Sequence, residues 1–106
     1  MNDELKDWFK VRHGMEEYIR PLPCVRDERG EIKEQTVKQL FAKINEELDE
    51  LKEAIYKNRF SRSVAEEAAD TITAITTLLE ALGIDAEMRD EAQRRVNDKN
   101  RKRNRL

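Results

Sequence analysis

Two consecutive stretches of helically spaced apolar residues constrain the fold of this chain most strongly. Between Lys33 and Lys57 apolar side chains recur every three or four residues, which places them on one face of a helix. This stripe consists of Val37, Leu40, Phe41, Ile44, Leu48, Leu51 and Ile55. The second stretch, Val64 to Leu82, is apolar over a wider arc and is rich in Ala and Thr, which permit close helix approach. Together they predict two helices that pack against each other.

Capping signals predict where the later helices begin and end. Ser63, with Glu66 three residues on, has the pattern of a capping box that opens the third helix after a turn at 58–62. Gly83 is the expected C′ residue of that helix, and Asp85 is the expected N-cap of a fourth helix over 86–101. Since Glu66 then has a capping role, we do not count it among candidate ligands.

An earlier helix is predicted over residues 3–19, before Pro21 and Pro23 end it. Its imperfect apolar stripe consists of Trp8, Phe9, Val11, Met15, Tyr18 and Ile19. With few glycines and prolines and a length of 106 residues, the chain is predicted to be one all-α domain, a four-helix bundle. We expect residues 1–30 to form the N-terminal helix and connection, 31–101 the core helices and 102–106 a basic tail.

The wide apolar arc of the third helix is too large for a single bundle of this size to cover. We therefore expect a homo-oligomer, a homodimer or a homotetramer, built through helical faces.

Two pairs of acidic residues indicate a metal site. Glu47 and Glu50 are three residues apart, as are Glu67 and Asp70, so each pair lies on one helical face. If the two helices pack side by side, four carboxylates converge, and their mutual repulsion requires a cation. All-oxygen ligation suits a hard cation, Mg²⁺ with Mn²⁺ as a substitute.

Composition alone makes such spacings common, because 42% of the residues are charged. The surroundings are more specific: the segment Val64–Leu82 holds four acids and no Lys or Arg, whereas a solvated helix usually pairs its acids at i+4. At 100° per residue, Glu47 lies about 70° and Glu50 about 130° from the centre of the apolar face. Both are on the flank that carries Lys43, at the edge of the core. A solvent-facing acidic stripe is the competing interpretation.

Three runs of this sequence resemble the MazG-like, all-α nucleoside triphosphate pyrophosphohydrolases. Residues 43–55 (KINEELDELKEAI) resemble the first signature of that family and residues 66–70 (EEAAD) the second. Residues 82–85 (LGID) are similar to the turn before its last helix. The resemblance covers residues 35–100, and the two signatures at this spacing are more specific than either alone.

The resemblance implies Mg²⁺-dependent attack on the α-phosphorus of an NTP or dNTP, which releases the monophosphate and pyrophosphate, in nucleotide house-cleaning. It also implies dimers or tetramers. Our site assignment has Glu47, Glu50, Glu67 and Asp70 as metal ligands, and one of these or Glu46 as the group that takes the proton from water.

A basic run follows on the last predicted helix, with seven Lys or Arg against one acid between Arg94 and Arg105. Part of it is expected to be a solvated tail. Arg94, Arg95, Asn97 and Lys99, with Lys43, are the candidate phosphate-binding residues, since related proteins use Asn and basic residues on their last helix. Nucleic-acid binding is disfavoured because no aromatic or fold motif accompanies the charge.

The remaining residues bear on base recognition and location. Trp8 is the first candidate to stack on a nucleobase, although core packing is the favoured role for it. His13 is excluded as a ligand because hard-cation sites rarely use histidine. The single Cys24, no signal peptide and no long apolar run predict a cytoplasmic protein without a membrane span. A non-catalytic helical interaction module and a nucleic-acid-binding oligomer are the alternatives to the enzyme.

Overall fold

A computed structural model of the chain describes residues 19–58 and 61–106. The described residues form four consecutive helical elements: α2 (Val37–Glu53), the π-helical turn η1 (Ala54–Asn58), α3 (Ser61–Ala81) and α4 (Ala86–Lys102). No strand occurs in these two ranges, so the predicted all-α class is confirmed. None of the described helices is long and apolar enough to cross a membrane. The predicted helix over 3–19 lies outside the described residues, apart from Ile19.

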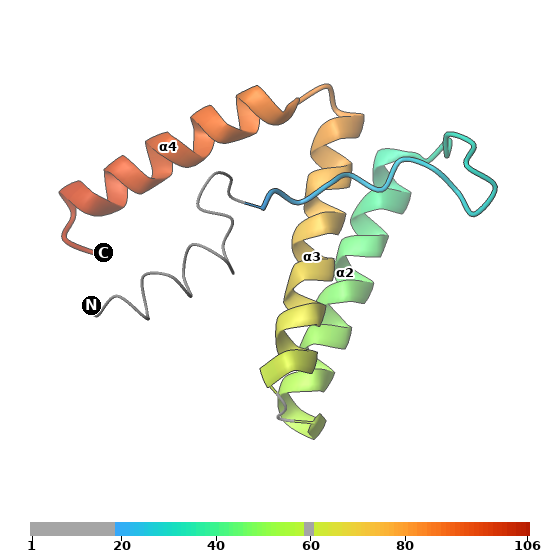
Figure 1. Cartoon of the computed structure of the whole chain (residues 1–106), viewed down its shortest axis with the longest axis horizontal. Coiled ribbons are helices and arrows are strands. Elements are labelled where there is room, and N and C mark those ends of the chain that lie inside the picture. The colour runs from blue at the N-terminus through green and yellow to red at the C-terminus, as the bar shows by residue number, and fades with distance from the viewer. Residues whose placement is uncertain (1–18, 59–60) are drawn as a thin grey trace, which may run out of the picture.

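The α2–α3 pair is the centre of the fold. The two helices run antiparallel and side by side (Figure 1). Their contact buries Leu40 and Ile44 from α2 against Ala74 and Leu78 from α3, with Ala54 buried at the start of η1. The predicted packing of these two stretches is confirmed, and small residues on α3 allow the close approach.

Three threonines of α3 are buried. The hydroxyl groups of Thr71, Thr76 and Thr77 each donate a hydrogen bond to the backbone carbonyl four residues earlier, at 2.8–2.9 Å. These bonds satisfy the hydroxyls without a partner on another helix, so polar residues cost little at buried positions here.

Residues 19–36 form an extended connection that crosses α3 (Figure 1). The backbone N–H of Cys24 donates to Oγ1 of Thr77 at 2.9 Å, which fastens the connection to α3. Further on, a turn at 27–30 with Gly30 at φ +81° reverses the chain, and Arg26 pairs with Ile32 in an isolated antiparallel bridge.

The start of α2 differs from the prediction by about a turn. Thr36 is the N-cap, and its side chain accepts from the backbone N–H of Gln39 while the Gln39 side chain accepts from the N–H of Thr36. This capping box fixes the start at Val37, and the extended backbone before it explains why Lys33 is not helical.

The predicted capping box at Ser63 is wrong. Ser63 is the third residue of α3, which begins at Ser61, so it is not the N-cap residue. The sequence has the pattern of serine followed three residues later by glutamate, but the helix begins two residues before this serine.

The junction of α3 and α4 agrees with the prediction. The N–H of Gly83 donates to the carbonyl of Glu80 at 3.0 Å, and the N–H of Ile84 donates to that of Leu79 at 2.9 Å. This is a Schellman motif with Gly83 at φ +80°. Asp85 then caps α4 by accepting from the N–H of Met88 at 2.9 Å.

α4 leaves the end of α3 and points away from the α2–α3 pair (Figure 1). None of its residues is buried. The three described α-helices therefore do not by themselves make a four-helix bundle, and that arrangement stays a prediction.

Candidate metal centre

Three of the predicted acidic side chains meet between α2 and α3. Glu47 and Glu50 stand one turn apart on α2, and Glu67 faces them from α3. One carboxylate oxygen from each residue lies within 4.8 Å of the other two. The three residues differ in exposure: Glu47 is buried, Glu67 is half-buried and Glu50 is exposed. The cluster is thus buried at Glu47 and open to solvent at Glu50.

Glu47 has one satisfied and one unsatisfied oxygen. Its side chain is only 10% exposed, and Oε1 lies 3.0 Å from the Nζ of Lys43, one turn earlier on α2. Oε2 is buried and receives no hydrogen bond from any described residue, and the same holds for Oε2 of Glu67. Buried carboxylate oxygens without donors are rare in folded proteins because each loses its hydration. Both therefore need a cation or another donor.

The repulsion within this cluster raises the pKa of Glu50. Its pKa is raised above the ordinary value, first by the negative charge of Glu47, then by partial desolvation and by the charge of Glu67. Lys43 opposes this shift weakly. The pKa of Lys43 is in turn raised by its hydrogen bond to Glu47 and by the charges of the neighbouring glutamates. The ammonium group of Lys43 thus interacts with the carboxylates of Glu46, Glu47 and Glu50.

The donor set fits a hard divalent cation. Three carboxylates contribute only oxygen atoms, two of which are buried and unsatisfied, and no histidine or cysteine belongs to the cluster. Mg²⁺ and Mn²⁺ prefer such ligands, and both retain water molecules when they bind through a few carboxylates. Because Glu50 is exposed, the cluster is open to solvent on that side.

Comparison with known proteins identifies the family. The family model described as phosphoribosyl-ATP pyrophosphohydrolase matches residues 24–97, which is more than half of the chain. The chain belongs to this phosphoribosyl-ATP pyrophosphohydrolase family. Searches of curated proteins and of solved structures gave no match.

Phosphoribosyl-ATP pyrophosphohydrolases belong to the all-α MazG-like nucleotide pyrophosphohydrolases, so the predicted superfamily is confirmed, while MazG itself is not specifically indicated. Membership identifies the chain as a pyrophosphohydrolase domain, which is a hydrolase. The matched region contains α2, η1, α3 and most of α4, and therefore the whole acidic cluster.

Asp70 and Glu46 are not part of the acidic cluster. Asp70 is exposed on α3, one turn beyond Glu67, and its carboxylate is outside the group of three. Glu46 is exposed, and its Oε2 lies 3.7 Å from the Nζ of Lys43. Their roles as fourth ligand and as proton acceptor stay predictions.

The candidate phosphate-binding residues of α4 lie elsewhere in the described structure. Arg94 and Arg95 both pair with Glu91, at 3.5 and 3.2 Å, and Asn97 accepts from Gln93 at 3.0 Å. Glu67 precedes the end of α3 by 14 residues, or about 21 Å of helix, and α4 continues beyond that end. Within one chain the structure therefore does not bring these residues to the cluster. Lys99 is exposed on α4, and Trp8 and His13 lie outside the described residues.

Two features of the site were missed in the sequence. The first is the pairing of Lys43 with Glu47, although the i, i+4 spacing of a base and an acid is its usual signal. The second is η1, which follows the cluster directly on the α2 side. Such π-helical turns are frequent near functional sites. The sequence of η1, AIYKN, has no residue pattern that predicts one.

Proposed function

We propose that this protein is a Mg²⁺-dependent nucleotide pyrophosphohydrolase that cleaves a nucleoside triphosphate, or a nucleotide with a related triphosphate chain, to the monophosphate and pyrophosphate. The observation that carries the proposal is the cluster of Glu47, Glu50 and Glu67, with two buried oxygens that lack donors. Membership of a pyrophosphohydrolase family supports the same reaction class. Nucleotide house-cleaning is the corresponding cellular role.

The three clustered carboxylates hold the cation, with Asp70 as the fourth proposed ligand. When bound, a divalent cation neutralises phosphate charge and acidifies a coordinated water. Glu47 and Glu67 each contribute a buried oxygen to the site, whereas the exposed Glu50 is free to adjust to the substrate. The carboxylate that accepts the proton from the attacking water is one of these four or Glu46.

Lys43 acts as the resident counter-charge in this proposal. Its ammonium group neutralises Glu47 at 3.0 Å and lies 3.7 Å from Glu46. Half of the side chain is exposed, so it can rotate away once a cation takes over Glu47. The freed ammonium group then lies beside the bound phosphates and can donate to a phosphate oxygen.

The basic residues of α4 contribute from another copy. Because Arg94, Arg95, Asn97 and Lys99 are not beside the cluster of their own chain, a homo-oligomer is the simplest way for them to reach the phosphates. The proposal therefore combines the predicted phosphate-binding role with the predicted oligomer.

Pyrophosphate release from a panel of substrates tests the function. The panel contains the NTPs, the dNTPs and phosphoribosyl-ATP, each assayed with Mg²⁺ and with EDTA. We expect Mg²⁺-dependent release with the matching monophosphate as co-product. Glu67→Gln should lower the rate by about 100-fold or more, since loss of even an outer partner of a metal ligand costs 10–100-fold.

Glu66→Gln is the matched control, because Glu66 is the adjacent exposed residue on α3 and is not part of the cluster. It should retain activity. No release from any member of the panel by folded protein, or equal loss in both variants, would contradict the proposal.

A further inference from the structure

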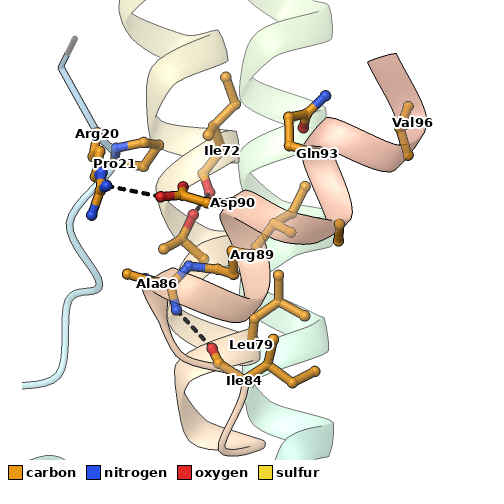
Figure 2. Close-up of a pocket in the computed structure, with 13 residues that line it drawn as sticks. Arg20, Pro21, Ile72, Leu79, Ile84, Ala86, Arg89, Asp90, Gln93 and Val96 are labelled. Carbon is orange, nitrogen blue, oxygen red and sulfur yellow. Dashed lines mark hydrogen bonds and ion pairs between the residues drawn. The ribbon is translucent and has the colours of Figure 1, made fainter. Parts of the chain in front are cut away.

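A groove lined mainly by apolar side chains lies between α3 and α4, away from the metal centre. It has a volume of about 460 Å³. Ile72, Ile75 and Leu79 of α3 form one wall and Val96 of α4 belongs to the other (Figure 2). Ile72 is 50% exposed, and Ile75 and Val96 are each 41% exposed. Apolar surface of this kind on both walls usually marks a contact with another segment of protein.

The chain itself leads into this groove. Arg20 and Pro21 line it, and the Nη2 of Arg20 pairs with Oδ2 of Asp90 on α4 at 2.8 Å (Figure 2). This ion pair holds the connection against α4 at the rim. Residues 1–18, which lie outside the described structure, are therefore joined to the chain at the edge of the groove.

The length and pattern of residues 1–18 suit the groove. As a helix they would extend about 27 Å, close to the roughly 26 Å of the 17-residue α4. Trp8, Val11 and Met15 are spaced by three and four residues, so in a helix they share one face. That face is large and apolar, as are the exposed side chains of the two walls.

We propose that residues 1–18 dock in the groove between α3 and α4 as a helix, with Trp8, Val11 and Met15 against Ile72, Ile75 and Val96. The segment is tethered at Arg20, so its effective concentration at the groove is in the millimolar range, which favours it over a second copy. Docking completes four helices within one chain and fixes the direction of α4. Trp8 then has a packing role.

Trp8 supplies a direct signal, because it is the only tryptophan of the chain. In the full-length protein we expect its emission to be shifted to the blue compared with denatured protein and its quenching by acrylamide to be weak. Val96→Asp places a charge in the groove, and should move the emission to the red and raise the quenching toward the denatured value.

Met88→Asp is the matched control. Met88 is 52% exposed on the same helix but does not line the groove. This variant should leave both signals unchanged. Far-UV circular dichroism of both variants shows whether the α-helices remain. Red-shifted Trp8 in the wild type, or a blue shift that survives in a folded Val96→Asp protein, would overturn the proposal.

A contact assay avoids any disturbance of the apolar walls. In a Cys24→Ser background, Gln93→Cys is labelled with bimane, whose emission tryptophan quenches on contact. Quenching is expected at this groove position and should disappear when Trp8→Phe is added. A label at Glu87→Cys, on α4 outside the groove, should be unquenched in either background.

The same assay distinguishes a second copy. Labelled Trp8→Phe protein is mixed with unlabelled protein that retains Trp8. No quenching in the mixture, together with quenching that is independent of concentration in the single chain, supports docking within the chain. Quenching in the mixture would show that another copy supplies the segment and would overturn the proposal as stated.

Discussion

Glu47 is a buried carboxylate that its described surroundings satisfy only in part. A buried carboxylate normally requires several donors, yet Glu47 has one, from Lys43, and its second oxygen has none among the described residues. The position therefore favours any ligand that brings positive charge. Its neighbours Glu50 and Glu67 add to the same demand.

Glu50→Gln should stabilise the protein in the absence of metal. Because the pKa of Glu50 is raised in the folded state above its ordinary value of 4.5, the folded form binds this proton more tightly than the unfolded form. The bound proton therefore stabilises the folded form at acidic pH, and this stabilisation is lost as the pH rises through the raised pKa of Glu50. The variant avoids that loss, so with EDTA its melting temperature should exceed that of the wild type at neutral pH.

Thermal unfolding across the acidic to neutral range measures this difference, which should vanish at acidic pH. Mg²⁺ should reverse the order, because the cation relieves the repulsion only in the wild type. Pyrophosphate release should fall in the same variant. An equal melting temperature at all pH values would show that the cluster carries no net repulsion.

Lys43→Met tests the resident counter-charge. Removing the ammonium group leaves Glu47 without its partner, so the variant should be less stable in EDTA. It should also bind Mn²⁺ about two- to fivefold more tightly, since a half-exposed ion pair is worth up to about 1 kcal/mol. Calorimetric titration with Mn²⁺ alone measures the affinity. Unchanged or weaker Mn²⁺ binding would mean that Lys43 does not compete with the cation.

At the scale of the helices, local signals near chain reversals were the most predictive. Gly83 and Asp85 could be recognised because a left-handed C′ residue and an N-cap each depend on one residue type. The pairing of α2 with α3 followed from apolar spacing. The start of α3 could not be predicted in the same way, since Ser63 satisfies a capping pattern that the continuing helix does not use.

Gly83→Ala should destabilise the junction of α3 and α4. Gly83 has φ +80°, where a Cβ costs about 1–2 kcal/mol for an ordinary L-residue, although nothing crowds the added carbon. Urea unfolding should show a loss of about 1 kcal/mol. Ala81→Gly, at the last residue of α3, is the comparison for a helical site. No loss in Gly83→Ala would mean that the Schellman turn does not limit stability.

At the scale of the whole molecule, much apolar surface remains exposed. Phe41, Leu48 and Ile55 are spaced by seven residues along α2 and η1 and are about half exposed, so they form one stripe on the outside of the α2–α3 pair. The buried apolar cluster of the described residues lies between the two helices. The sequence could predict an excess of apolar surface. It could not predict which helical faces stay exposed in a single chain, because that depends on the direction of α4.

Leu48→Asp should weaken the predicted homo-oligomer. A charge in the middle of the stripe opposes its burial in a helical interface, and light scattering with size-exclusion chromatography should show a shift toward monomer. Ala42→Asp introduces the same charge about 120° away on α2, at an exposed position, and should leave the assembly intact. A wild-type protein that is monomeric at all concentrations would contradict the expected oligomer.

Direct Mn²⁺ binding tests, without any substrate, whether Glu47, Glu50 and Glu67 form a divalent-cation site. Protein freed of metal is titrated with Mn²⁺, and the unbound ion is followed by its electron paramagnetic resonance signal. We expect wild-type and Glu66→Gln proteins to bind and Glu67→Gln to lose that binding, with Mg²⁺ displacing Mn²⁺ from the first two. Mn²⁺ binding that is equally strong in Glu67→Gln, or absent from folded wild-type protein, would contradict the assignment.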